Sequence, residues 1–424
     1  MAVCYFNKKY DKAYNCQYEV KKDGIEVWVD YDIENEIPEV NGMRIFGSNT
    51  EFDERDILII DYKEKMNYLL KSAHYSGLSQ VWGTPDVSCT TRFFSHFYFC
   101  DTSYEKMFQL PNDEKIRKIR VYSNAINELI GHPSIHEINS ENEVIYKLKK
   151  DTVKYLVEIG NNNIIKLTVS DDWKTNQSYK TNEINIHFNG YIELELKEEI
   201  NYEEVYGYVQ ELTMYFQLLR PNKFIINKIL VEINDVYYGL WIPIKEINYK
   251  NSYVKTSVDD KLVDYLSRCY NKLPFRNNRS EIRNIPYIIL NTSRNLEDNF
   301  LMLYRFIECY YKKQNIKDIN KTFIKYGIEN NYKDIDKIEN VENIVYEIVS
   351  LRNHYVHNGY HISNQELYIA FPKINNKANP KNHRAHNVNF DWIYDRTKIL
   401  YEIAIDIIFK DMLNYELYKF DMHF

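Results

Sequence analysis

The periodicity of the apolar residues changes near residue 245, and this change constrains the fold more than any other feature of the sequence. Before it, apolar and polar residues alternate as in strands, and segments 17–31 and 184–196 contain turn signals (Lys-Asp-Gly and Asn-Gly) that predict strand pairs. One helical segment, 202–219, interrupts this pattern and ends before Pro221. Two further strand regions are expected at 92–99 and 228–241. Residues 1–245 are therefore predicted to form a β-rich α+β domain.

After a polar stretch at 246–261, which we interpret as a linker, the spacing of the apolar residues becomes helical. Apolar residues three and four positions apart occur in the segments 261–271, 296–314, 318–326, 341–357 and 392–417. We therefore expect an all-α helical bundle at 262–424. The fold class predicted for the 424 residues is α+β, with a β-rich N-terminal domain followed by this bundle.

Composition excludes several classes of protein. Hydrophobic residues make up 44% of the chain and charged residues 27%, with only 12 Gly and 10 Pro, so collagen-like and largely disordered chains are excluded. The formal charge is −7, from 54 Lys+Arg against 61 Asp+Glu. A nucleic-acid site on this chain therefore has to be a local basic patch.

Cellular location is predicted from what the sequence lacks. The six cysteines show no repeated spacing of a disulfide framework, so we expect reduced thiols. The first residues contain no apolar signal-peptide core, and no run approaches 18 apolar residues. We therefore expect a cytoplasmic protein with no membrane partner.

The most informative predicted helix lies at 341–357. Its apolar stripe consists of Val341, Ile344, Val345, Ile348 and Val349. The same register continues to Arg352, and an arginine on an apolar stripe is costly unless a partner, an interface or an anionic ligand receives it. Asn353, His354 and His357 follow at the helix end. Two interpretations stay open: a ligand site, or an arginine that reaches water while a histidine favours the helix dipole.

The sequence RNHYVH at 352–357 resembles the R-x4-H motif of the HEPN superfamily, small helical bundles of which many are metal-independent ribonucleases. The surroundings are similar to those of the motif in HEPN proteins: an amphipathic helix that contains Glu308 precedes it, and a long helix follows it. The layout of the whole chain resembles the ApeA-type anti-phage proteins. One departure is Asn358 before Gly359, where many HEPN proteins have Gly directly after the histidine, but Asn also accepts a left-handed cap.

This resemblance implies a HEPN-like ribonuclease at 262–424 that needs no metal or other cofactor and acts as a homodimer in bacterial anti-phage defence by abortive infection. It implies a composite catalytic site formed by Arg352 and His357 of both protomers, with Asn353 orienting the phosphate or the histidine. RNA, with tRNA as one candidate, would be the substrate, and a phage-derived trigger would act on the N-terminal domain. His354 would contribute to substrate binding.

Metal-free cleavage of RNA has requirements that these residue types meet. A base must take the proton of the 2′-hydroxyl, and an acid must protonate the leaving 5′-oxygen; a histidine with a pKa near neutrality can do either. Positive charge must stabilise the phosphorane, and arginine offers planar, paired donors to phosphate oxygens.

A basic segment follows the motif and contains no acidic residue. Its four cations are Lys373, Lys377, Lys381 and Arg384. On an acidic chain, this patch is the expected grip on RNA phosphates. The alternative is a solvated loop with no ligand.

Other chemistry is not supported. Cys89, His96 and Cys100 match no common zinc spacing, and the chain has no Walker loop, G-x-G-x-x-G or H-E-x-x-H motif. The alternative to a ribonuclease is a non-catalytic HEPN-like module that dimerises or binds RNA or protein beside a sensor domain. The intact Arg352 and His357 favour the enzyme, because a scaffold does not need an imidazole there.

Overall fold

The structure is a computed structural model, and all structural statements concern the residues that it describes. These are residues 2–7, 12–30, 39–40, 43–44, 55–80, 89–110, 114–123, 126, 135–140, 143–148, 155–158, 163–178, 183–219, 225–243, 262–273, 296–313, 348–349, 351–357 and 385–414. The predicted linker at 246–261 lies outside them.

The chain divides into two compact units. The first unit comprises Met1–Leu212, Phe224–Glu246 and Asp259–Ser267. The second comprises Thr213–Lys223, Ile247–Val258 and Arg268–Phe424.

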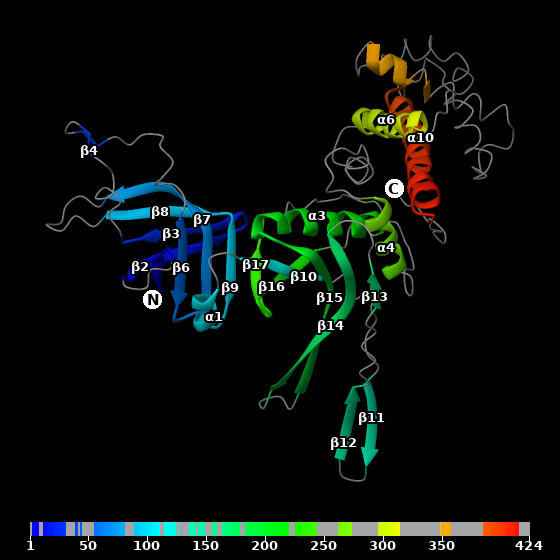
Figure 1. The fold of residues 1–424 in the computed structure, drawn as a ribbon. Helices are drawn as coiled ribbons and strands as arrows, with labels where there is room; N and C mark the ends of the chain where they lie inside the picture. The colour runs from blue at the N-terminus through cyan, green and yellow to red at the C-terminus, as the bar shows by residue number, and fades with distance from the viewer. Residues whose placement is uncertain are drawn as a thin grey trace. The chain divides into compact units, whose positions relative to one another are not determined.

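Six strands of the first unit close into a β-barrel (Figure 1). They are β1 (Ala2–Phe6), β2 (Tyr14–Lys21), β3 (Gly24–Val29), β6 (Arg55–Asp61), β7 (Met66–Gln80) and β8 (Cys89–Ser95). Every neighbouring pair is antiparallel, and the pairing of β8 with the second half of β7 completes the ring. Alternate residues of these strands point inward, so Cys4, Val27, Ile57, Leu70 and Phe93 are fully buried in one core.

The sheet continues from the barrel through β9 (Phe97–Asp101), which pairs with the first half of β7. The strands that follow, in spatial order, are β17 (Val236–Trp241), β16 (Ile226–Ile233), β10 (Ile116–Ser123), β15 (Glu183–Ile200), β14 (Ile164–Ser178) and β13 (Tyr155–Glu158). Two separate strand pairs are β4 (Glu39–Val40) with β5 (Met43–Arg44) and β11 (Ile135–Ser140) with β12 (Glu143–Leu148). Helix α1 (Tyr104–Gln109) and the first half of α3 (Tyr202–Leu219) also belong to the first unit, whereas α3 from Thr213 onward belongs to the second.

Alternation along the strands separates an apolar face from a charged face. In β10, Ile119 and Val121 are fully buried, whereas Arg120 between them points to the other face. Opposite it in β15 stands Glu193, and the two side chains form an ion pair of 2.7 Å between Nη2 and Oε2. The period of two that was visible in the sequence is therefore the period of this sheet.

Two predicted strand regions differ from the structure. Residues 184–196 belong to one continuous strand, β15, and not to a hairpin at Asn189-Gly190. Residues 92–99 are divided between β8 and β9, because the chain bends at His96 and Ser95 hydrogen-bonds both the carbonyl of Lys71 and Phe97. In both places contacts with distant strands decide the outcome.

The second unit contains α6 (Leu296–Lys313), a helical segment at 351–357, α10 (Ala385–Asp406) and a final π-helical turn, η5 (Ile407–Met412). The helices α6 and α10 pack against each other, with Phe300, Ile307, Leu400 and Ala404 buried. The end of α4 (Leu262–Lys272) supplies two cations to the carboxyl end of η5. Arg268 and Lys272 donate to the carbonyl of Leu413 at 3.3 and 3.2 Å, satisfying a terminal acceptor.

The predicted fold class is wrong. The described residues form a closed six-stranded β-barrel with additional strands and six helices in all, and no all-α HEPN-like bundle is formed among them. Helical periodicity shows that a segment has an apolar face, but it does not show which element covers that face. Segment 318–326, residues 341–347 and residue 350 lie outside the described residues, and the assembly seen in the second unit is mainly the pair α6 and α10.

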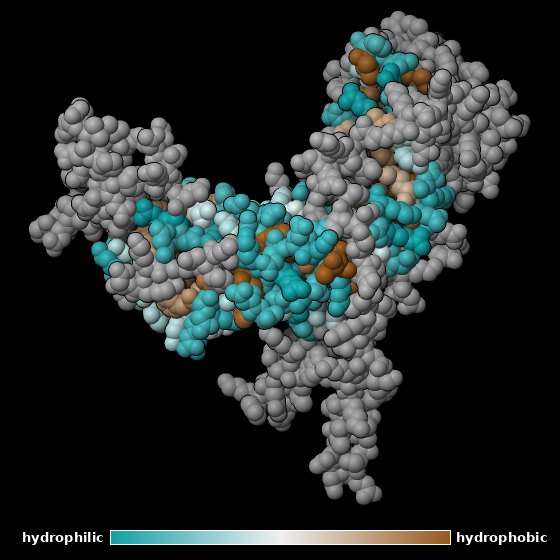
Figure 2. Space-filling view, in the orientation of Figure 1, coloured by the Kyte–Doolittle hydropathy of each residue, from teal (hydrophilic) through white to brown (hydrophobic). Residues whose placement is uncertain are grey.

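The described residues visible in Figure 2 present a largely hydrophilic surface, with apolar residues in small separate groups. Exposed large aliphatic side chains in the described part of the chain are Val20, Ile165, Ile225 and Val356. They lie on different segments of the chain. None of the described helices is long and apolar enough to cross a membrane.

Candidate functional site

Arg352 lies at the edge of the buried face of its helix. The fully buried residues are Ile348 and Leu351, followed one turn later by Tyr355 at 4% exposure. Arg352 is half-buried, and Val356, which the predicted stripe would bury, is 46% exposed. The buried stripe is therefore rotated by about one residue from the predicted one, which places the guanidinium at the boundary between core and solvent.

Three side chains surround the guanidinium of Arg352. Tyr304 and Glu308 lie one helical turn apart on α6, so both face the helical segment at 351–357, which we call the motif helix. The guanidinium carbon lies 5.6 Å from the centre of the Tyr304 ring, and Nη2 lies 3.9 Å from Oε2 of Glu308. Within its own helix, Nη1 donates a hydrogen bond of 2.9 Å to Oδ1 of Asn353. The side chain of Asn353 thus fixes one edge of the guanidinium.

The electrostatics of this cluster are visible at Tyr304. Burial raises the pKa of its hydroxyl, the charge of Glu308 raises it further, and the positive charge of Arg352 opposes the rise. Glu308 is the more buried partner of the ion pair, with its side chain 17% exposed against 30% for Arg352. The cation is therefore the partner that a ligand reaches first.

His357 is exposed near the end of the described helical segment. It lies five positions after Arg352, which corresponds to about 7.5 Å along the axis and a rotation of roughly 140°. One helix therefore brings Arg352 together with Asn353 but presents His357 on a different face. His354 is half-buried, with its ring centre 6.4 Å from that of Tyr355.

Lys373, Lys377, Lys381 and Arg384 all lie outside the described residues. No three His, Cys, Asp or Glu side chains of the described residues are grouped so that they could hold a metal ion.

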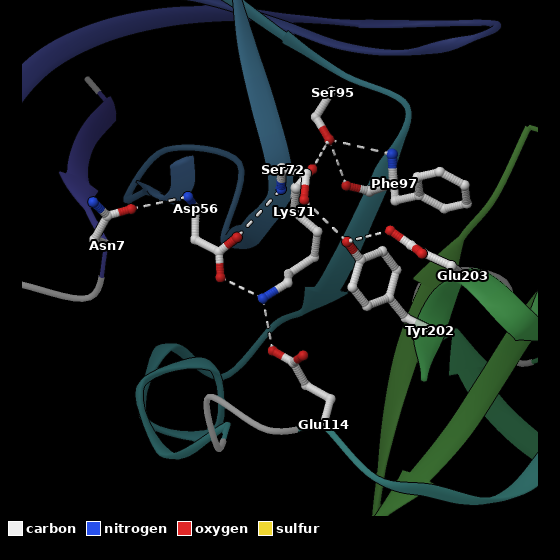
Figure 3. A network of polar contacts seen from close by, with 9 residues as sticks. All are labelled: Asn7, Asp56, Lys71, Ser72, Ser95, Phe97, Glu114, Tyr202 and Glu203. Atoms are coloured by element: carbon white, nitrogen blue, oxygen red, sulfur yellow. Dashed lines mark hydrogen bonds and ion pairs between the residues drawn. The ribbon is translucent and has the colours of Figure 1, made fainter. Parts of the chain in front are cut away.

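A second charged cluster, around Lys71, lies in the first unit and was not expected from the sequence (Figure 3). The Lys71 side chain is only 7% exposed, and its Nζ donates to Asp56 and, at 2.9 Å, to Oε1 of Glu114. The ring centre of Tyr202, at the start of α3, lies 5.6 Å from Nζ. Burial alone would lower the pKa of Lys71, but hydrogen bonds and charges of the two carboxylates outweigh it and raise the pKa.

The Lys71 cluster organises the place where the barrel closes. Ser72 has a left-handed backbone (φ 46°), and near it β7 exchanges β9 for β8 as its partner. The backbone N–H of Ser72 donates to Asp56, and its hydroxyl lies 3.1 Å from that of Tyr202. The cluster therefore fixes a strained bend and ties β6, β7, the segment before β10 and α3 together, which is a structural role. The sequence signal was a lone lysine in an apolar strand, Met66–Gln80, but nothing local pointed to Glu114.

Comparison with known proteins gives no match: no protein-family model, no curated protein and no solved structure matches this chain.

Proposed function

We propose that this protein is an endoribonuclease that cleaves RNA without a metal ion, with Arg352 and His357 as its catalytic residues. The observation that carries the proposal is the state of Arg352. Its guanidinium is fixed against Tyr304 and beside Glu308, yet among the described residues it makes one hydrogen bond, to Asn353. Because arginine has five N–H donors, several remain for phosphate oxygens.

His357 supplies the proton transfers of the proposed reaction. As a base it takes the proton of the ribose 2′-hydroxyl, whose oxygen attacks the phosphorus while the bond from phosphorus to the 5′-oxygen breaks. As an acid, an imidazolium protonates that leaving oxygen. The products are a 2′,3′-cyclic phosphate and a 5′-hydroxyl end, and Arg352 stabilises the charge on the phosphorane between them.

A homodimer supplies the second histidine that one helix cannot bring to the same phosphate. The rotation of roughly 140° between Arg352 and His357 leaves them on different faces of one helix. Two motif helices related by a two-fold axis would each contribute both residues to one composite site. Asn353 keeps the guanidinium oriented, and His354 contributes to binding of the RNA.

The likeness of the motif at 352–357 to that of HEPN ribonucleases supports a setting in anti-phage defence by abortive infection. In this proposal the RNA that is cut, with tRNA as one candidate, belongs to the infected cell, and a phage-derived trigger acts on the first unit.

The test compares wild-type protein with His357→Ala on total tRNA and other cellular RNA, with and without EDTA. Since His357 is exposed, the substitution should leave folding and oligomer size unchanged. Cleavage should fall by about 10²- to 10⁴-fold, as expected for loss of an acid–base group, and wild-type cleavage should persist in EDTA. Strict dependence on Mg²⁺ or Mn²⁺, or full activity of a stable monomer, would contradict the mechanism.

One observation favours a second candidate, a module that binds RNA or protein without cutting. The contacts of Arg352 with Tyr304 and Glu308 are also those of an arginine that only anchors one helix on another. Under this alternative, wild-type protein leaves RNA intact, and His357→Ala changes nothing.

A further inference from the structure

The ion pair between Arg352 and Glu308 is loose. The separation of 3.9 Å between Nη2 and Oε2 exceeds hydrogen-bond length, so the carboxylate acts on the guanidinium through charge. A carboxylate that oriented an arginine would accept two parallel hydrogen bonds from it. Here the orientation comes from the amide of Asn353 and the ring of Tyr304. Glu308 therefore acts on the guanidinium of Arg352 through its charge and does not fix its orientation.

We propose that Glu308 is an internal competitor of the RNA phosphate at Arg352, and that its charge lowers the affinity of this site for RNA. The inference rests on the proposed function, since it takes Arg352 to be the phosphate-binding group. It assigns to Glu308 on α6 a role outside the motif at 352–357, which is to limit the affinity of Arg352 for the RNA phosphate.

Distance and burial support this competition. A phosphate oxygen that accepts a hydrogen bond of about 3 Å from Nη2 lies at most about 7 Å from Oε2, from the sum of that length and 3.9 Å. Two negative charges at this separation repel each other, and screening is reduced because Glu308 is 17% exposed and lies beside the buried Tyr304. Free wild-type protein would thus hold RNA weakly at this site.

The test measures binding of a 2′-O-methyl oligoribonucleotide, which cannot be cleaved because it lacks the attacking hydroxyl. Glu308→Gln removes the charge and keeps the shape, and it should tighten binding by about three- to tenfold at low salt. The matched control is Glu297→Gln on the same helix, about 16 Å away along the axis, which should change binding less than twofold. A second uncharged variant, Glu308→Met, should show the same tightening.

The dependence on Arg352 makes the test specific. In an Arg352→Gln background, Glu308→Gln should no longer tighten binding, because the competition requires the guanidinium. The gain should also shrink as salt rises. Unchanged or weaker binding of both Glu308 variants, or no binding of RNA by any variant, would overturn the inference. If the wild type binds but does not cut RNA, the proposed ribonuclease fails while a tightening by Glu308→Gln still supports the competition.

Discussion

Two cations of this molecule, Lys71 in the barrel and Arg352 in the second unit, each lie near a tyrosine ring and near carboxylates. They differ in how many carboxylates they contact and how closely. Each lies 5.6 Å from the centre of a tyrosine ring. Lys71 is 7% exposed and hydrogen-bonded to two carboxylates, Asp56 and Glu114. Arg352 is 30% exposed, and the carboxylate of Glu308, which is the one near it among the described residues, is 3.9 Å away.

The difference separates a structural charge from a charge that can act on a ligand. Two of the three donors of Lys71 are used by carboxylates, and almost no surface is left for a ligand. Most donors of Arg352 are unused by the described residues, and its charge is only partly compensated. Donor saturation and exposure, taken together, thus identify the site more clearly than the presence of a buried charge does.

The largest effect on stability is expected for Lys71→Met. Removing the cation leaves the buried Glu114 and the partly buried Asp56 without the lysine that they share, and loss of one partner of a buried ion pair typically costs about 3–5 kcal/mol in the free energy of unfolding. Urea denaturation of the full chain measures it. The control Lys63→Met removes a lysine whose side chain is 80% exposed and should leave the unfolding midpoint unchanged. Equal unfolding midpoints for the two variants would contradict the structural role of Lys71.

A smaller effect on stability and a larger one on RNA are expected for Arg352→Met. The half-exposed ion pair with Glu308 contributes about 1 kcal/mol or less, so the free energy of unfolding should change little. RNA binding should weaken about tenfold or more, since a charge-assisted hydrogen bond to phosphate is lost. Both quantities are measured on the same preparation. A loss of stability as large as that of Lys71→Met, with unchanged RNA affinity, would make Arg352 a structural residue as well.

Local signals were sufficient where the contacts that decide the structure are local. Helix α3 occupies residues 202–219 as expected, and the expected strand region 228–241 forms β16 and β17, which are joined by a turn at Asn234-Asp235 with both residues in the left-handed region (φ 51° and 62°). Arg352 was recognisable because a charge in an apolar register is unusual, and its partial burial against α6 agrees with that signal.

The rest depends on contacts between residues far apart in the sequence. The barrel closes where β7 changes its partner from β9 to β8, and the bend at this point is held by Lys71 and Glu114, which are 43 residues apart. No periodicity encodes such a pairing. The helical bundle failed as a prediction for the same reason, because an apolar helix face does not name the element that covers it. The likeness of the motif at 352–357 to that of HEPN proteins did not predict the fold correctly either.

The smallest effect is expected from the basic segment, and it tests how much these four cations add to the phosphate binding proposed for Arg352. If these cations bind RNA phosphates as proposed, replacing Lys373, Lys377, Lys381 and Arg384 with Ser removes contacts that position RNA without taking part in proton transfer. Each lost phosphate contact should reduce the slope of log affinity against log salt by about 0.7 for single-stranded RNA. Cleavage at saturating RNA should change little, because the acid–base group His357 is intact. Binding isotherms at two salt concentrations, for wild type and the four-fold variant, give the slopes. Equal slopes would assign the segment to solvent and leave Arg352 with a larger share of the phosphate contacts.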